Sequence, residues 1–168
     1  VAIKYMARSY KFKEDIKVIK IFNESKCLAE TLKGYIERHL SFPASLMYTY
    51  LVLDKKNPMK LFVVTNYPDE WKKTYLQNNL QLTDPVIRVA LQRSYPFSWD
   101  ESISLLSDVK SSKIFSLSKK YNISNGFTWI LHDHDENLFL LSVVNANLQI
   151  NGIPPSQVGD IQMLLIDI

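Results

Sequence analysis

Three aromatic side chains with polar ends recur at helical spacing. Tyr67, Trp71 and Tyr75 are four residues apart, so they share one face of a helix and its entry. An indole N–H can only donate a hydrogen bond, whereas a Tyr hydroxyl can donate or accept one. An aromatic stripe is ordinarily core material, but three such rings buried side by side need partners for their polar ends. The spacing therefore permits two interpretations, plain packing or a set of donors that line a ligand site.

Asp84 is the candidate acceptor near this stripe. It lies between Leu82-Thr83 and Pro85-Val86, with no cation beside it. An Asp before Pro is a strong helix N-cap, worth about 0.5–2 kcal/mol against Ala. Its carboxylate could equally accept the N–H of a small neutral ligand inside an apolar site. The spacing alone favours the cap and leaves the second role open.

Other chemistry finds little support. The cluster His132-Asp133-His134-Asp135-Glu136 offers ligands for zinc or iron. We expect it instead to be the polar turn of a hairpin, and we predict no metal site. The sequence has no Gly-x-Ser-x-Gly motif and no Gly-rich phosphate loop, and Cys27 has no evident His partner. We therefore predict neither an enzyme nor a cofactor.

Alternating helices and hairpins must position these side chains. Apolar spacing predicts a helix over about 24–40, and β-forming runs predict a hairpin of strands 46–54 and 60–65. Helices are expected over 68–78, 84–91 and 108–121, with 96–99 irregular. A second hairpin is expected over 127–132 and 138–144, and then a loop over 145–155 and a helix over 156–168. This order predicts an α+β fold, an antiparallel sheet with helices packed on it.

Composition agrees with one globular domain. The chain has 168 residues, of which 46% are hydrophobic and 22% are charged. No stretch approaches the roughly 20 consecutive apolar residues of a membrane helix, so we expect no membrane contact. A single cysteine excludes an internal disulfide, and we expect a cytoplasmic location.

Charge is unevenly distributed along the chain. Residues 1–20 carry six Lys or Arg and two Asp or Glu, a balance of +4. The remaining residues carry 14 basic and 15 acidic side chains, a balance of −1. The body of the chain therefore lacks the basic footprint of a nucleic-acid-binding domain.

Four ordered motifs are diagnostic when taken together. They are Tyr67-x3-Trp71-x3-Tyr75, Asp84-Pro85-Val86, Pro96-Phe97-x-Trp99, and Asn125-Gly126 before a strand. This combination resembles the autoinducer-binding domain of LuxR-type quorum-sensing regulators, over about 22–168. Residues 113–128 look closest to the EsaR and ExpR branch. The resemblance implies an α-β-α sandwich with a central antiparallel sheet, of GAF/PAS-like layout, that encloses an N-acyl-L-homoserine lactone.

The resemblance also implies ligand-binding roles, position by position. Trp71 matches the donor to the lactone carbonyl, and Asp84 matches the acceptor of the ligand's amide N–H. Tyr67 matches the donor to the amide carbonyl, and Ser142 falls where a strand hydroxyl supports the same group. Positions that pack on the ring or tail are matched by Tyr75, Val86, Trp99, Phe115 and Ile123.

Domain organisation follows from the same resemblance. We expect residues 1–20 to be an N-terminal extension of unknown role and 21–168 to be the autoinducer-binding domain. The family's C-terminal helix-turn-helix DNA-binding domain is absent from these residues. We expect a homodimer that contacts DNA only through that missing domain and senses a short-chain lactone with a 3-oxo group. Two alternatives stay open, a GAF- or PAS-like sensor of a different small molecule, and a lactonase or amidase.

Overall fold

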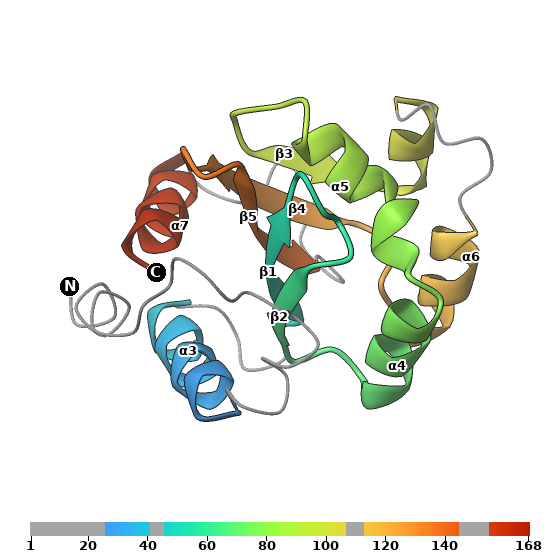
Figure 1. The fold of residues 1–168 in the computed structure, drawn as a ribbon, viewed down its shortest axis with the longest axis horizontal. Helices are drawn as coiled ribbons and strands as arrows, with labels where there is room; N and C mark the ends of the chain where they lie inside the picture. Colours follow the sequence, from blue (N-terminus) through green and yellow to red (C-terminus); the bar gives the residue numbers. More distant parts are fainter. Residues whose placement is uncertain (1–25, 41–45, 107–112, 145–154) are drawn as a thin grey trace.

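Helices cover both faces of a five-stranded antiparallel sheet in the computed structural model of this chain (Figure 1). The structure describes residues 26–40, 46–106, 113–144 and 155–168. The helices are α3 (Lys26–His39), α4 (Asp69–Gln77), α5 (Pro85–Ala90), α6 (Ile114–Ser118) and α7 (Pro155–Asp167). The strands are β1 (Tyr48–Asp54), β2 (Leu61–Thr65), β3 (Phe97–Trp99), β4 (Gly126–His132) and β5 (Asn137–Val144). The predicted α+β class and α-β-α sandwich are confirmed.

The sheet has the strand order β2-β1-β5-β4-β3. Both predicted hairpins are present, β1 with β2 and β4 with β5, and the pairing of β1 with β5 joins them. The expectation that 96–99 is irregular is wrong, because Phe97 pairs with Thr128 and Trp99 pairs with Gly126. Three residues are too few to show the alternation of a strand, so only the pairing partner reveals β3.

Strand alternation divides the interior into two cores. The α3–α7 core lies between the sheet and helices α3 and α7, on the left in Figure 1. Its buried side chains are Leu32, Ile36, Leu40, Tyr48, Tyr50, Val64, Trp129, Leu141, Val143, Ile161, Leu164 and Leu165.

The α4–α6 core lies on the opposite face, under helices α4, α5 and α6. Its buried side chains are Leu51, Leu53, Leu61, Trp71, Ile87, Val89, Ala90, Phe97, Trp99, Ile103, Ile114, Phe115, Ile123, Ile130, Leu138, Leu140 and Val144. Successive residues of a strand point to opposite faces, so each of the central strands contributes to both cores.

Helix boundaries agree with the sequence in most places. α3 buries the predicted stripe through Leu32, Ile36 and Leu40, and α7 ends the described chain as expected. In α4, Pro68 is the N-cap rather than the first helical residue. Within the described part of 108–121 the helix is short, because α6 gives way to a 3₁₀ turn at Lys119–Tyr121.

Some predicted segments lie outside the described residues. They are the extension 1–20, part of the helix over 108–121, and most of the loop over 145–155. Within the described ranges, no helix combines the length and the apolarity needed to cross a bilayer.

Candidate ligand-binding site

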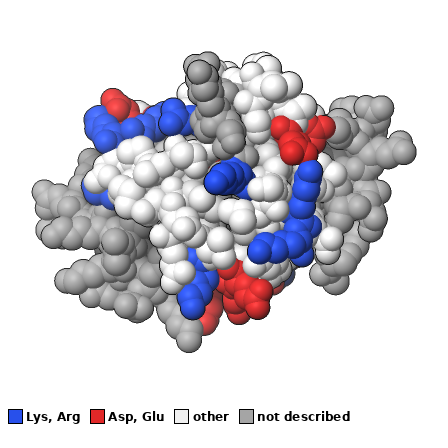
Figure 2. Space-filling model, turned by 90° about the vertical axis from the view of Figure 1, so that its right-hand side faces the viewer, with Lys and Arg blue, Asp and Glu red and all other residues white. Residues whose placement is uncertain are grey.

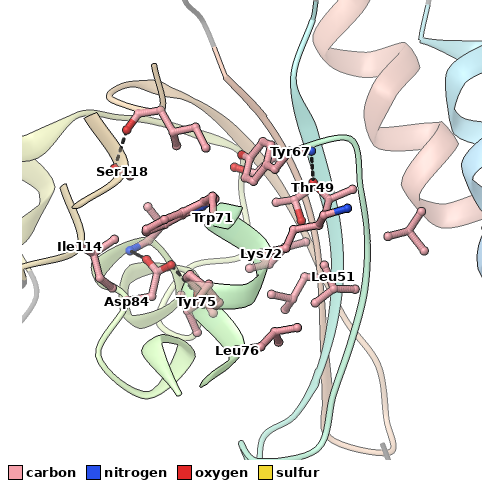
Figure 3. A pocket seen from close by; sticks show the side chains of 18 of the residues that line it. Thr49, Leu51, Tyr67, Trp71, Lys72, Tyr75, Leu76, Asp84, Ile114 and Ser118 are labelled. Carbon is pink, nitrogen blue, oxygen red and sulfur yellow. Dashed lines mark hydrogen bonds between the residues drawn. The ribbon is translucent and has the colours of Figure 1, made fainter. Parts of the chain in front are cut away.

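A cavity of about 520 Å³ lies between the sheet and α4–α6 (Figure 3). This volume falls within the roughly 300–1,000 Å³ typical of small-molecule sites. The cavity is lined by every residue that the sequence assigned to a ligand site, namely Tyr67, Trp71, Tyr75, Asp84, Val86, Trp99, Phe115, Ile123 and Ser142. The fold therefore brings together residues from α4, α5, α6, two strands and the segments between them. Their role as ligand contacts stays a prediction.

The aromatic stripe leaves two polar groups facing this cavity. Trp71 is 3% exposed and packs edge-on against Tyr75, with ring centroids 5.8 Å apart (Figure 3). The Trp71 indole N–H and the Tyr67 hydroxyl make no hydrogen bond with any residue that the structure describes. Burial, and then the charge of Asp84, raises the pKa of the Tyr67 hydroxyl, so that this group keeps its proton and can donate.

The Asp84 carboxylate accepts hydrogen bonds at both of its oxygens, one from the backbone of α5 and one from a side chain of α4. Its Oδ1 accepts a hydrogen bond from the Val86 backbone N–H at 2.8 Å, which confirms the predicted N-cap of α5. Its Oδ2 accepts one from the Tyr75 hydroxyl at 2.7 Å (Figure 3). Because Asp84 also lines the cavity, its role as the cap does not exclude contact with a ligand.

Burial governs the charge of Asp84. Desolvation raises the pKa of its carboxyl above the ordinary value, although the Tyr75 hydroxyl and the backbone N–H groups of Val86 and Ile87 oppose this shift. A further donor from a ligand would favour the ionised form in the same way. The cavity thus holds a buried carboxyl whose desolvation is only partly offset by hydrogen bonds from the protein.

Tyr75 has a role that the sequence did not reveal. It was predicted only to pack on a ligand, yet its hydroxyl holds the Asp84 carboxylate in place. The two residues are nine positions apart, one in α4 and the other at the N-cap of α5, so no local spacing signals the contact.

A chain of hydrogen bonds fixes Ser142 on the opposite wall. The Trp99 indole N–H donates to Ser142 Oγ at 3.2 Å, and Ser142 Oγ is also bonded to Thr128 Oγ1. Trp99 can approach the sheet because Gly126 has no side chain. A Cβ at Gly126 would lie 2.4 Å from the Trp99 ring and 2.3 Å from the Val143 carbonyl oxygen. The sequence analysis predicted neither the hydrogen bond of Thr128 to Ser142 nor the close approach of the Trp99 ring to Gly126.

Most of the further lining residues on the strands come from alternate positions. Thr49 and Leu51 on β1, Val63 and Thr65 on β2, and Leu140 on β5 all face the cavity. The predicted hairpins carried the signal for these residues, since every second residue shares a face. The hairpins did not indicate which face of the sheet would border the cavity.

Charged side chains lie at one end of the lining. Glu30 and Lys33 come from α3, and Asp69 and Lys72 come from the start of α4. Lys72 Nζ lies 2.5 Å from Asp69 Oδ1. The two signs are balanced there, so the charges at this end do not select an ionic ligand.

The polar cluster 132–136 comprises the last residue of β4, His132, and the turn that leads to β5. Asp133 Oδ1 accepts hydrogen bonds from the backbone N–H groups of Asp135 and Asn137, at 3.0 and 2.7 Å. The His132 ring is bonded through Nε2 to the Arg93 carbonyl oxygen. The hairpin turn predicted for this cluster is therefore confirmed, and across the described residues no group of three or more His, Cys, Asp or Glu is placed to hold a metal ion.

Surface charge on the α4–α6 side is mixed. Figure 2 shows Lys and Arg interspersed with Asp and Glu and separated by uncharged areas on the described part of this face. The described residues of this face therefore form no continuous basic surface of the kind that binds a nucleic-acid backbone.

Sequence comparisons identify relatives of this domain. The sequence model of the family described as "Autoinducer binding domain" matches residues 29–168. The transcriptional activator EsaR of Pantoea stewartii subsp. stewartii is 50% identical over 149 residues, which cover 87% of this chain and 60% of EsaR. The transcriptional activator YukR of Yersinia ruckeri is 52% identical over 136 residues, 79% of this chain and 59% of YukR.

These relatives test two of the sequence predictions. The predicted similarity to the EsaR and ExpR branch is confirmed, because both EsaR and an ExpR protein are among them. The relatives are transcriptional activators rather than enzymes, which agrees with the prediction that the chain is not an enzyme. The chain spans about 60% of the length of EsaR.

Solved structures share the fold. SdiA of Escherichia coli matches with a TM-score of 0.55 at 18% identity, over 97% of this chain and 62% of SdiA. A second SdiA structure, in complex with octanoyl-rac-glycerol, matches with a TM-score of 0.55 at 17% identity, over 97% of this chain and 60% of SdiA. Both likenesses support the sandwich architecture described above.

Proposed function

Because this chain belongs to the autoinducer-binding domain family of LuxR-type quorum-sensing regulators, we propose that it binds an N-acyl-L-homoserine lactone in the cavity under α4–α6. The occupied domain then controls DNA binding by a C-terminal helix-turn-helix domain outside these 168 residues. Residues 21–168 form the sensing domain in this proposal, and 1–20 are an extension.

The observation that carries this proposal is the convergence of unmatched polar groups on one apolar cavity. The Trp71 N–H and the Tyr67 hydroxyl are donors without partners among the described residues, and Asp84 is a buried acceptor. An acyl-homoserine lactone is uncharged and carries two carbonyls and one amide N–H at one end, with a hydrocarbon tail at the other. Each of its polar groups therefore finds a complement, and the tail suits the apolar remainder.

Roles can be assigned to each wall. Trp71 donates to the lactone carbonyl, Tyr67 donates to the amide carbonyl with Ser142 beside it, and Asp84 accepts the amide N–H. The ring and tail pack on Tyr75, Val86, Trp99, Phe115 and Ile123, which line the same cavity. A site of this kind discriminates strongly, because an analogue lacking one polar group leaves a buried protein group unpaired.

The finer features of the proposal come from the family relationship. We propose that the ligand has a short acyl chain, near six carbons, with a 3-oxo group, as the resemblance of residues 113–128 to the EsaR and ExpR branch implies. We also infer a cytoplasmic homodimer, and exposed Met163 and Ile166 on α7 offer an apolar surface for the second copy. Sedimentation of the purified chain tests the dimer, and a monomer at micromolar concentration would contradict it.

Native mass spectrometry of the chain, expressed with and without added lactone, tests the function directly. We expect a mass increase equal to one intact lactone per chain, together with a higher melting temperature. A ligand at 100 times its Kd stabilises by about 2.7 kcal/mol. An unchanged mass and melting curve with short- and medium-chain lactones would refute the proposal. Recovery of a hydrolysed lactone would indicate a lactonase or amidase instead.

An acylglycerol is a second candidate ligand, because SdiA was solved with octanoyl-rac-glycerol. This molecule also combines an acyl tail with a polar head, but it has no amide N–H for Asp84. The same mass measurement identifies it, as a copurified adduct present without added lactone. Its free glycerol hydroxyls can donate to Asp84 in place of an amide N–H, so the mass of the bound molecule, rather than dependence on Asp84, distinguishes the two ligands.

A further inference from the structure

Four hydroxyl side chains lie in one row across the sheet. The strand registers place Thr65 opposite Thr49, Thr49 opposite Ser142, and Ser142 opposite Thr128, on the neighbouring strands β2, β1, β5 and β4. We call these residues the hydroxyl row. Thr65, Thr49 and Ser142 line the cavity, and Thr128 is fully buried beside it.

The members of the row differ in their partners. Thr65 Oγ1 donates to the Tyr48 carbonyl oxygen and accepts from the Tyr67 backbone N–H. Ser142 and Thr128 are bonded to each other. Thr49 is different, because its hydroxyl makes no side-chain hydrogen bond within the described parts of the chain.

Packing alone does not require a hydroxyl at Thr49. The next pair on the same face of β1 and β5 is Leu51 with Leu140, which makes an apolar wall. Val has nearly the shape of Thr and the same preference for strands. A hydroxyl that faces an apolar cavity without a partner loses hydrogen bonding that it would have in water. A polar ligand group next to Thr49 would supply the missing hydrogen-bond partner.

We propose that the Thr49 hydroxyl donates to a second carbonyl on the acyl chain, the 3-oxo group, and thereby sets the preference for 3-oxo over unsubstituted lactones. This inference rests on the proposed function. Directly opposed residues on antiparallel strands have Cβ atoms about 4.5–5.5 Å apart. The amide and 3-oxo carbonyls are separated by a single methylene, so one can meet Ser142 while the other meets Thr49, its partner in the strand register.

The test compares two ligands on three proteins. Binding of 3-oxohexanoyl- and hexanoyl-homoserine lactone is measured by calorimetry on the parent chain, Thr49→Val and Thr49→Ser. Thr49→Val should weaken binding of the 3-oxo lactone about two- to twelvefold and leave the hexanoyl lactone unchanged. Thr49→Ser retains a hydroxyl and should retain the preference. Melting temperatures of all three proteins verify that they are folded.

Thr65→Val is the matched control, because the Thr65 hydroxyl already has backbone partners. It should change the affinity for both lactones by the same factor. If Thr49→Val also weakens both lactones equally, or if the parent chain shows no preference, the inference about Thr49 is overturned and the proposed function stands. If the parent binds neither lactone nor any other acyl-homoserine lactone, the proposed function fails and this inference fails with it.

Discussion

The two faces of the sheet use their buried tryptophans in opposite ways. Trp129 lies in the α3–α7 core at 0% exposure, and its indole N–H donates to the Val158 carbonyl oxygen at 2.9 Å. Trp71 lies in the α4–α6 core at 3% exposure, and its N–H has no acceptor among the described residues. The rings are equally buried, so burial alone does not distinguish a structural aromatic from a candidate ligand contact. The state of the polar atom does.

Tyrosines repeat the contrast. The Tyr48 hydroxyl, on the α3–α7 side, donates to Glu37 Oε1 at 3.2 Å. The Tyr67 hydroxyl, on the cavity side, has no such partner in the described chain. An unpaired polar group in an apolar region costs free energy, so a cavity that gathers several such groups is arranged for a molecule that pairs them.

Adjacent leucines on β5 give the largest expected difference between the two faces. Leu141 is 0% exposed in the α3–α7 core, and Leu140 lines the cavity on the other side. Leu141→Ala should lower the free energy of unfolding by about 2–5 kcal/mol and leave lactone affinity intact. Leu140→Ala should cost less stability, because it enlarges an existing space, and should weaken binding. Urea unfolding and calorimetry measure the two quantities, and equal effects of the two variants would contradict the division into a filled and a hollow face.

Asp84→Asn separates capping from ligand contact. Asn caps a helix about as well as Asp, so the unliganded variant should be at least as stable as the parent at pH 7. Hydrogen bonds to a charged acceptor are worth about 1.5–3 kcal/mol, so lactone affinity should fall roughly ten- to a hundredfold. Lost stability with intact binding would show that Asp84 serves only as the cap.

Lactone affinity should also depend on pH through Asp84. Burial raises the pKa of this carboxyl in the unliganded fold, and the ligand's amide N–H favours the ionised form. Affinity should therefore fall as the pH is lowered through the raised pKa, by no more than in Asp84→Asn, because a protonated carboxyl resembles the amide. The variant should show no such dependence, and a parallel decline in both proteins would rule out Asp84 as its origin.

The same carboxyl affects stability with the opposite sign. Its pKa is higher in the folded chain than in the unfolded chain, so the folded state binds more protons. In the unliganded protein, the contribution of Asp84 to stability should decrease as the pH rises from the ordinary pKa of Asp, about 3.9, through the raised value.

Matched Trp→Phe variants give the smallest expected effects and the sharpest comparison. Trp71→Phe removes an unpaired N–H, so stability should change little and affinity should fall by about 0.5–1.5 kcal/mol. Trp129→Phe leaves the Val158 carbonyl without its donor, so stability should fall while affinity stays unchanged. Thermal unfolding and calorimetry on both variants measure the contrast. If Trp71→Phe left the lactone affinity unchanged, the Trp71 N–H would not contact the ligand and the ring would serve only to pack the core.

Local signals predicted most of the fold. The apolar stripe of α3, the Asp84-Pro85 start of α5 and the two hairpins depend on neighbours within a few residues, so spacing and turn chemistry indicated them correctly. Strand β3 was missed because three residues contain no complete period and its pairing partner lies on β4. The family resemblance placed nine residues at the site, and all of them line the cavity.

The sequence by itself determined the periodicities, the caps and the residue types that could bind a neutral amide, because these depend on chemistry within one element. Only the tertiary structure decided that the α4–α6 face would be hollow and the α3–α7 face filled. It alone joined Tyr75 to Asp84, Trp99 to Ser142, and Thr49 to the row of hydroxyls. These contacts depend on strand register and helix placement between distant segments, and a one-residue shift of register would turn every side chain of a strand to the other face.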